Sequence, residues 1–406
     1  MEPTERTAGS LQGWILVSAS WLSVVATSLI APVLPRMAAH FATTPGVETM
    51  VQLAIALPSL FVGLLAGSMG VLVDRIGRKG VLLVGLAAYA LLGMAPLWLD
   101  ALPGVLISRC GVGVAEAAIF TAGGALLGDF FRGQEREKWF AVQAGSATLL
   151  AVAMLLIGGA LGEISWRAPF VIYALPILQV GLVLAFIREP RRPGREATTE
   201  KAAGSFDWRK VALPAAVSFF SSMAFFVVVI QLGFVLTERG YDSPAMIGFG
   251  AAGSSLAVPV GAILFRLMGR WSPAARLSLA LALLALGFAI IGLTRSYGAT
   301  VAGATVNSLG GGILIPTLLS WSLRDLGSGE LGRGSGMWNT AFALGQFFSP
   351  LSVLGLGSLL GGLSQTLLAY GAMVGIAAAI SVFIVVRTQA ASSASRHPHT
   401  PEGLET

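Results

Sequence analysis

The stretch "GVLVDRIGRKG", residues 70–80, concentrates charge in a chain that otherwise has little of it. Four of its eleven residues are charged, namely Asp74, Arg75, Arg78 and Lys79, and three are glycines. Long apolar stretches flank it on both sides. A charge inside the hydrocarbon core of a membrane is costly, so charges between apolar runs gather in the loops. The stretch is therefore typical of a short loop between two membrane helices.

The composition points the same way. Of the 406 residues, 55% are hydrophobic and 11% are charged, whereas soluble domains are about 25% charged. A helix that crosses a membrane needs about 20 mostly apolar residues. The chain has twelve such runs, too continuous for the alternating strands of a β-barrel. They lie at about 12–35, 50–73, 80–99, 102–127, 139–161, 169–187, 211–237, 244–265, 274–293, 297–323, 335–359 and 362–386.

The loops between these runs predict how the chain is oriented. The leader "MEPTERTAGS" carries two glutamates and no cleavage motif follows it, so we expect the first run to stay as a membrane helix. Lys and Arg are abundant in alternate loops and scarce in the others. Because cytoplasmic loops carry the excess of positive charge, we expect both termini in the cytoplasm. The predicted location is the bacterial inner membrane, crossed many times.

The net charge of +6 has the same explanation. The basic residues sit in short loops and no basic domain stands apart from the apolar runs, which argues against nucleic-acid binding. Cys110 is the only cysteine, and no Cys/His cluster has the spacing of metal ligands. We therefore expect no metal and no cofactor.

One polar segment, residues 188–210, divides the chain into two groups of six runs. We predict a six-helix bundle at 1–187, a cytoplasmic linker at 188–210, a second six-helix bundle at 211–387 and a disordered tail at 388–406. "GVLVDRIGRK" aligns weakly with "GAILFRLMGR", residues 261–270, in the corresponding loop of the second half. Duplication of a six-helix unit explains this match, and such repeats commonly form two bundles around a central site.

The loop "GVLVDRIGRK" resembles the loop between helices 2 and 3 of the major facilitator superfamily, written G-x-x-x-D-R-x-G-R-R/K. Other segments resemble the same family in order: "RCGVGVAEAA" (109–118) its helix 4, "WRAPF" (166–170) the start of its helix 6, and "NTAFALGQFFSPL" (339–351) its helix 11. The resemblance implies an all-α integral membrane fold of twelve transmembrane helices in two six-helix bundles. It also implies transport by alternating access, not enzymatic activity.

The resemblance further implies a gate on the cytoplasmic side. Asp74 is expected to meet the start of helix 11, near residues 334–337, and Arg78 to pair with Asp129 at the end of helix 4. These contacts would hold the two bundles together. The alternative is that the cations only fix the orientation of the chain. The implied gating residues are Gly70, Asp74, Arg75, Gly77, Arg78, Lys79 and Asp129.

Two charged residues lie inside predicted membrane helices. Arg109 and Glu116 are seven residues apart, about 10 Å along one helix face. In one interpretation Glu116 carries a proton, and Arg109 either adjusts the pKa of that carboxyl or binds an anionic group. Burial favours a neutral carboxyl, whereas a nearby cation favours a charged one. In the other interpretation, both belong to a structural polar network.

Neutral polar residues inside the predicted helices are candidate substrate ligands, although each could instead bond two helices together. They are Gln52, Gln143, Gln231, Asn307, Asn339 and Gln346. Aromatic residues are candidates to line an apolar cavity: Trp21, Phe225, Phe226, Trp321, Trp338 and Phe342. Two features depart from proton-driven drug antiporters of the family. "MLLIGG" (154–159) stands where they carry G-P-x-x-G-G, and the first helix lacks an acid.

We predict a secondary active transporter that couples protons to the efflux of a small amphipathic molecule. The alternative is a proton symporter or uniporter that imports a small organic anion or nutrient, with Arg109 holding a carboxylate. A membrane enzyme or receptor is disfavoured, since all three histidines lie in a loop or the tail and no phosphate-binding glycine loop is present. The expected partners are a small-molecule substrate, protons and the lipid bilayer, and we expect a monomer.

Overall fold

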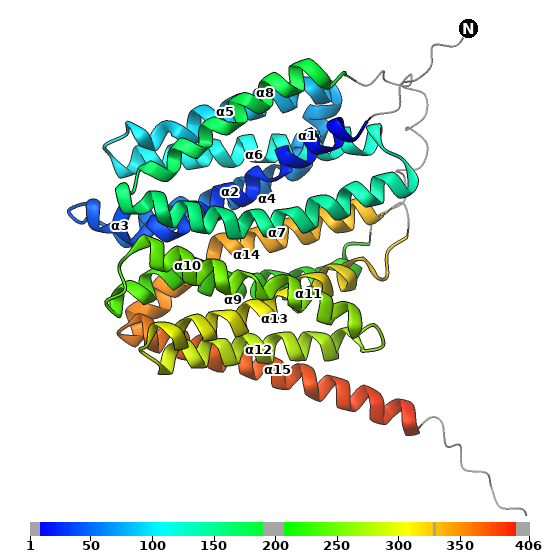
Figure 1. Cartoon of the computed structure of the whole chain (residues 1–406). Helices are drawn as coiled ribbons and strands as arrows, with labels where there is room; N and C mark the ends of the chain where they lie inside the picture. Colours follow the sequence, from blue (N-terminus) through cyan, green and yellow to red (C-terminus); the bar gives the residue numbers. More distant parts are fainter. Residues whose placement is uncertain (1–8, 190–206, 328–329, 395–406) are drawn as a thin grey trace, which may run out of the picture.

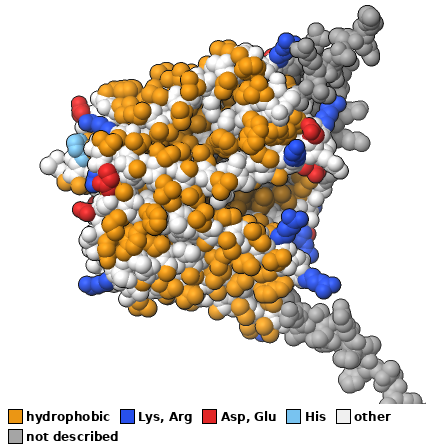
Figure 2. Space-filling model, viewed as in Figure 1, with side chains coloured by type: hydrophobic (Ala, Val, Ile, Leu, Met, Phe, Trp, Pro, Cys, Tyr) orange, Lys and Arg blue, Asp and Glu red, His pale blue; other side chains and the backbone are white. Residues whose placement is uncertain are grey.

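The structure, a computed structural model, describes residues 9–189, 207–327 and 330–394 and is entirely helical over those ranges. Within them, twelve helices or runs of broken helix are long and apolar enough to cross a membrane. This confirms the twelve spans predicted from hydropathy. Figure 2 shows hydrophobic side chains over most of the visible face, with the charged ones at its two ends.

The first half of the chain forms the N-terminal bundle. Its elements are α1 (Ser10–Ser20), α2 (Leu22–Ser28), η1 (Ala31–Val33), α3 (Leu34–His40), α4 (Val47–Ile76), α5 (Arg78–Met94), η2 (Ala95–Leu97), α6 (Leu102–Phe130), α7 (Gly133–Ile164), η3 (Ala168–Ala174) and α8 (Leu175–Phe186). The second half forms the C-terminal bundle. Its elements are α9 (Arg209–Glu238), α10 (Pro244–Ser255), α11 (Ala257–Leu267), α12 (Pro273–Leu293), α13 (Tyr297–Leu323), α14 (Leu331–Leu360) and α15 (Leu363–Ala394).

Each bundle has its own core of buried apolar side chains, with Ile230 of α9 the one member of the first core that comes from the second bundle. The two bundles lie side by side, and α7 and α4 of the first face α10 and α14 of the second. Helix α1 begins, α8 ends, α9 begins and α15 ends on the same side of the molecule (Figure 1). We call that side the linker end and the opposite side the far end.

Four of the spans combine more than one helical segment, and in two of them the α-helix itself is interrupted. The first span changes direction at Trp21 and again around η1, which contains Pro32. The span made of α10 and α11 breaks at Leu256, three residues before Pro259. Proline has no backbone N–H and clashes with the preceding turn, so it favours a break at such positions. These breaks allow the chain to bend around the helices that it packs against.

The predicted tail begins later than expected. Helix α15 runs to Ala394, so residues 388–394 continue the last membrane helix and the prediction of a disordered tail from 388 is wrong for them. The segment "TQAASSA" is rich in alanine, the strongest helix former, which explains the extension. Residues 395–406, and residues 190–206 of the predicted linker, lie outside the described residues.

Glycines bring the helices of each bundle close together. A Cβ atom placed on Gly113 of α6 would lie 2.7 Å from backbone atoms of Pro58 in α4, whereas one placed on Gly124 of the same helix meets nothing within 4 Å. Membrane helices lack a hydrophobic driving force between them, so close van der Waals packing at small residues is a main source of their association.

These two glycines make a matched pair for a stability test. We expect Gly113→Ala to lower the melting temperature, because overpacking a tight contact costs about 1–3 kcal/mol. Gly124→Ala is expected to keep or raise it, because alanine is favoured over glycine in a helix by about 0.5–1 kcal/mol. The measurement is thermal unfolding of the purified protein in detergent. Equal melting temperatures for the two variants would contradict the packing described here.

Candidate functional site

Arg109 of α6 is fully buried, with 0% of its surface exposed. One of its terminal nitrogens donates a hydrogen bond to the Tyr173 hydroxyl at 2.8 Å. Its guanidinium lies over the rings of Tyr173 and Phe170, 4.8 and 5.4 Å from the ring centroids. Such cation–π contacts stabilise a desolvated arginine. The charge of Arg109 is therefore engaged inside the N-terminal bundle and does not reach the space between the bundles.

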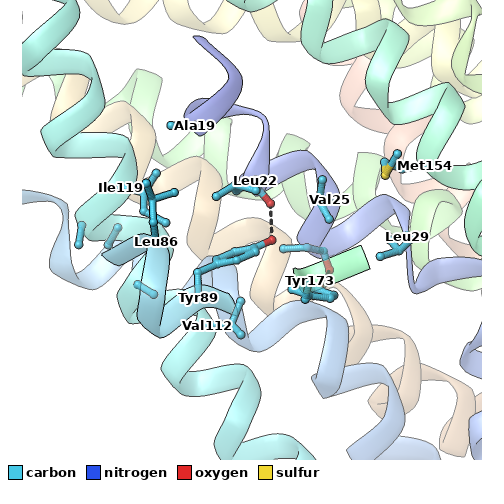
Figure 3. Close-up of a cluster of buried hydrophobic side chains, with 14 of the residues drawn as sticks. Ala19, Leu22, Val25, Leu29, Leu86, Tyr89, Val112, Ile119, Met154 and Tyr173 are labelled. Atoms are coloured by element: carbon cyan, nitrogen blue, oxygen red, sulfur yellow. Dashed lines mark hydrogen bonds between the residues drawn. The ribbon is translucent and has the colours of Figure 1, made fainter. Parts of the chain in front are cut away.

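Two tyrosines attach this arginine to the broken first span. The Tyr89 hydroxyl of α5 donates to the Leu22 carbonyl at 2.7 Å, and the Tyr173 hydroxyl of η3 donates to the Ala26 carbonyl at 3.4 Å. The two rings stack with centroids 5.3 Å apart (Figure 3). Hydrogen bonds to backbone carbonyls are effective next to a helix break, where the regular ladder is disturbed. The network fixes α2 against α5, α6 and η3.

Glu116 lies two turns along α6 from Arg109 and is 8% exposed. The Ser23 hydroxyl of α2 and the Arg109 guanidinium lie near its carboxyl group. The described residues provide no hydrogen-bond partner for its Oε2 atom. A buried carboxyl with an oxygen that lacks a donor has room to take up a proton, which then removes the cost of burying a charge.

The neutral polar candidates do not gather at one site. Gln231 of α9 donates to Gln52 of α4 at 2.7 Å, and this bond joins the two bundles toward the far end. Asn307 of α13 is 1% exposed and donates to the Leu284 carbonyl at 3.4 Å inside the C-terminal bundle. These residues bond helices together. The other three candidates are partly exposed, and they are Gln143 of α7 and Asn339 and Gln346 of α14.

Partly exposed aromatic side chains lie where the bundles meet. On α14 the rings of Trp338 and Phe342 stack with centroids 5.2 Å apart, and Phe342 meets the edge of Phe226 from α9 at 5.9 Å. Phe226 packs against both cores, which places it between the bundles. Across from them, the Trp21 indole donates to the Ser146 hydroxyl at 2.9 Å. Figure 2 shows the surface hollowed between the two halves, toward the linker end.

The far end, by contrast, is closed. Gly158, Gly159 and Gly162 of α7 pack directly on the first span and on α10. A Cβ atom on Gly159 would lie 2.6 Å from the Pro244 carbonyl oxygen. One on Gly248 of α10 would lie closer still to the Leu155 carbonyl oxygen, so both would clash. Helix α7 packs on α10 along this contact. The hollow between the bundles is thus open at one end only.

At the linker end, the ion pair expected between Arg78 and Asp129 is present. It joins α5 to α6 within the N-terminal bundle, so in this structure it does not hold the two bundles together as the resemblance implied. Asp74 is exposed and forms no ion pair within the described part of the chain. Asp74 is exposed because it lies beyond the contact between α4 and α14. The Thr340 hydroxyl of α14 donates to the Gly63 carbonyl of α4 at 3.0 Å, and Asp74 lies eleven residues further along α4.

Sequence reasoning missed the partner of this loop. The Glu189 carboxylate, just beyond α8, accepts hydrogen bonds from the backbone N–H groups of Arg78 and Lys79 at 2.7 and 2.8 Å. These are the first N–H groups of α5, so Glu189 caps that helix and complements its dipole. Gly77, at φ +117°, makes the turn that exposes them. The available signal was an acid directly after the sixth span, opposite a glycine turn.

Within the described ranges, no group of three or more His, Cys, Asp or Glu side chains is arranged to hold a metal ion. The features present in the described residues are twelve spans in two bundles, a hollow between the bundles that is open at one end, and a buried acid within the N-terminal bundle. This arrangement defines a secondary membrane transporter.

The comparison with known families agrees. Residues 16–350 match the Major Facilitator Superfamily, and the chain belongs to that family. It is a multi-pass transporter of the bacterial inner membrane and not an enzyme. The tetracycline resistance protein, class B, of Escherichia coli is 27% identical over 313 residues, which span 73% of this chain and 76% of that protein. The multidrug efflux protein YfmO of Bacillus subtilis is 25% identical over 229 residues, 55% of this chain and 56% of that protein.

A solved structure shares the fold. A bacterial homologue of the human lysosomal transporter Spinster, in an inward-facing and unoccupied conformation, superimposes with a TM-score of 0.77. The match covers 93% of this chain and 97% of that one, at 17% sequence identity. At that identity the likeness concerns the fold alone.

The tyrosine network predicts a stability change. Tyr173→Phe removes the acceptor of the Arg109 N–H, and an unsatisfied buried donor costs about 1–3 kcal/mol, so we expect a clearly lower melting temperature. Tyr241→Phe is the matched control, because its ring packs on Tyr297 and the C-terminal core while its hydroxyl makes no hydrogen bond within the described residues. Thermal unfolding in detergent measures both. If Tyr173→Phe melts with the wild type, the hydroxyl does not support Arg109.

Proposed function

We propose that the protein exports a small amphipathic molecule from the cytoplasm by alternating access and couples that export to proton entry. The linker end faces the cytoplasm in this proposal, because the loops there carry most of the Lys and Arg residues. The described conformation is then open to the cytoplasm and closed to the outside. Export would require the hollow to close at the linker end and open at the far end.

The burial of the Glu116 side chain is the main observation in favour of proton coupling. Among the described residues, Glu116 is the only acid with a buried side chain. An ionisable residue inside a membrane helix is costly, and such residues usually serve an ion or proton pathway. Ser23, which lies near the carboxyl, is itself partly exposed. It offers a polar step between Glu116 and the space between the bundles.

The aromatic side chains between the bundles support an amphipathic cargo. Trp338, Phe342 and Phe226 offer ring faces and edges, and rings of this kind bind flat apolar groups. The retained Gly158 and Gly159 of "MLLIGG" make the close far-end packing, so the missing Gly-Pro leaves that contact in place. The names of the similar proteins, which include tetracycline resistance and multidrug efflux, support export of compounds of this type.

The alternative, import of an organic anion, receives less support. It assigned the substrate carboxylate to Arg109, but that side chain is 0% exposed and already bonded to Tyr173. An anion could reach it only if the N-terminal bundle came apart. The same geometry supports a structural role for Arg109, beside Glu116.

Proton coupling is tested in energised inside-out vesicles with a pH-indicator dye. The probes are tetracycline, a lipophilic cation, a neutral drug and an organic acid. We expect at least one probe to release protons from the lumen through the wild type and not through Glu116→Gln at matched expression, because the amide cannot take up the proton. Glu135→Gln, an exposed acid in the first turn of α7, is the control and is expected to behave as wild type. Equal responses from all three proteins would remove Glu116 from the mechanism.

The aromatic contact predicts a change in apparent affinity. Phe342→Ala removes the ring between Trp338 and Phe226, and an aromatic pair contributes about 0.5–1.5 kcal/mol beyond its area. We expect the KM for an exported aromatic probe to rise by roughly 2- to 10-fold. Phe348→Ala, an exposed phenylalanine of the same helix, is the control. An unchanged KM for Phe342→Ala would place the cargo elsewhere.

A further inference from the structure

The far-end contact between the bundles is built from small residues. Helix α7 presents Gly159 to Pro244 and Gly248 of α10, and a Cβ atom on Gly248 would lie 3.1 Å from the Gly159 Cα atom. Packing of this kind brings backbones together through van der Waals contact. It has no direction of its own, since glycine faces can slide apart without breaking a specific bond. The Gln231–Gln52 hydrogen bond already joins the bundles toward this end, and a second directional interaction, at the glycine contact itself, would hold the end closed.

Glu163, in the last turn of α7, supplies that interaction. Its Oε1 atom accepts hydrogen bonds from the Ser243 hydroxyl and from the Ala245 N–H, the latter at 3.0 Å. Ser243 is the N-cap of α10 and accepts from the Met246 N–H at 3.2 Å, so its own proton is free to go to Glu163. A carboxylate at a helix N-terminus is further stabilised by the helix dipole. An acid of the N-terminal bundle therefore completes the cap of a helix in the C-terminal bundle.

Arg36 orients this acid from its own side. The guanidinium, at the end of the first span, bonds the Glu163 Oε2 atom at 2.8 Å. It also donates to the carbonyls of Gly162 and Glu163, at 2.7 and 3.1 Å, which end α7. A cation at a helix C-terminus complements the negative end of the dipole. With one carboxylate oxygen held by Arg36, the other points at α10.

Two other ion pairs of the described residues lie within the N-terminal bundle, as the pair of Arg36 with Glu163 does. Arg167 and Asp100 pair within the N-terminal bundle at the same far end, at 2.7 Å, and Arg78 pairs with Asp129 within it at the linker end. Rigid-body opening of the far end leaves both intact. The bonds from Glu163 to Ser243 and Ala245 must break in that movement.

We propose that Glu163 is a positioning residue of the transport cycle, whose bonds to the N-terminus of α10 hold the far end closed. The proposal goes beyond the proposed function, because it needs only alternating access and neither proton coupling nor a particular cargo. Loss of the carboxylate removes bonds that exist only in the far-end-closed state. The population then shifts toward the far-end-open state.

A single cysteine reports which state is populated. Gln231 is 1% exposed and is covered where the bundles meet, so a cysteine there reacts with a maleimide only when the far end opens. The background combines Cys110→Ala, which removes the native thiol, with Gln231→Cys, which also removes the Gln231–Gln52 bond. All variants share this background, so the labelling rates are compared only among them. The purified full chain in lipid nanodiscs is labelled with a soluble maleimide, which reaches both membrane faces. The readout therefore depends on neither the orientation nor a substrate.

We expect Glu163→Ala to raise the labelling rate by about tenfold, which corresponds to about 1.4 kcal/mol. Glu163→Gln is expected to raise it less, because its amide oxygen still accepts from Ser243 and Ala245 while the ion pair with Arg36 is lost. Asp100→Ala is the matched control. It removes a carboxylate of the same end that is paired within one bundle, and its labelling rate should stay unchanged.

Equal labelling of Glu163→Ala and Asp100→Ala would overturn the proposal, whether both rates rise or both stay low. If Glu163→Ala does not run as a single peak in size-exclusion chromatography, Ser243→Ala takes its place, because it removes one of the same bonds from the opposite bundle. It too is expected to label faster than Asp100→Ala, and an equal rate counts against the proposal. A failure of the proton-release assay with Glu116→Gln would leave this result standing, since labelling needs no proton gradient.

Discussion

At the far end, α7 and α10 approach so closely that glycine faces glycine, and this contact sets the arrangement of the two bundles. Any side chain at Gly159 or Gly248 would force the helices apart there. Because the bundles meet closely at this end, they diverge toward the linker end, where the surface is hollowed (Figure 2). The opening and the exposure of Asp74 are both consistent with that single contact.

The charged residues inside the membrane occupy a different place from the aromatic ones. Arg109 and Glu116 are packed within the N-terminal bundle, while Phe342 and its neighbours lie between the bundles. The first span connects the charged residues with the far-end contact. Its α2 segment carries Ser23 beside Glu116, and the Leu29 carbonyl rests on Gly158 of α7. Tyrosine hydroxyls hold this span in place (Figure 3). Proton site and far-end contact thus share one broken helix.

The twelve spans follow from hydropathy because lipid selects long apolar helices regardless of packing. The Arg78–Asp129 pair was expected from the resemblance of the loop to the family and is present. Helix faces were harder to predict. Gln52 and Gln346 look alike in the sequence, yet Gln52 bonds the other bundle and Gln346 is partly exposed. Which way a polar side chain points depends on its neighbouring helices. Glu163 was missed because its partners lie about 80 residues away, at a helix end that the sequence does not bring near it.

The central claim is that the two ends open in alternation. Spin-label pairs at exposed positions measure it directly, with Ile164 and Asp242 across the far end and Ile76 and Leu331 across the linker end. Pulsed electron paramagnetic resonance in nanodiscs gives the distance distribution of each pair, in a background without Cys110. The account predicts two populations at each end, and the fraction closed at the far end should equal the fraction open at the linker end. Fractions that do not match, or ends that open together, would contradict it.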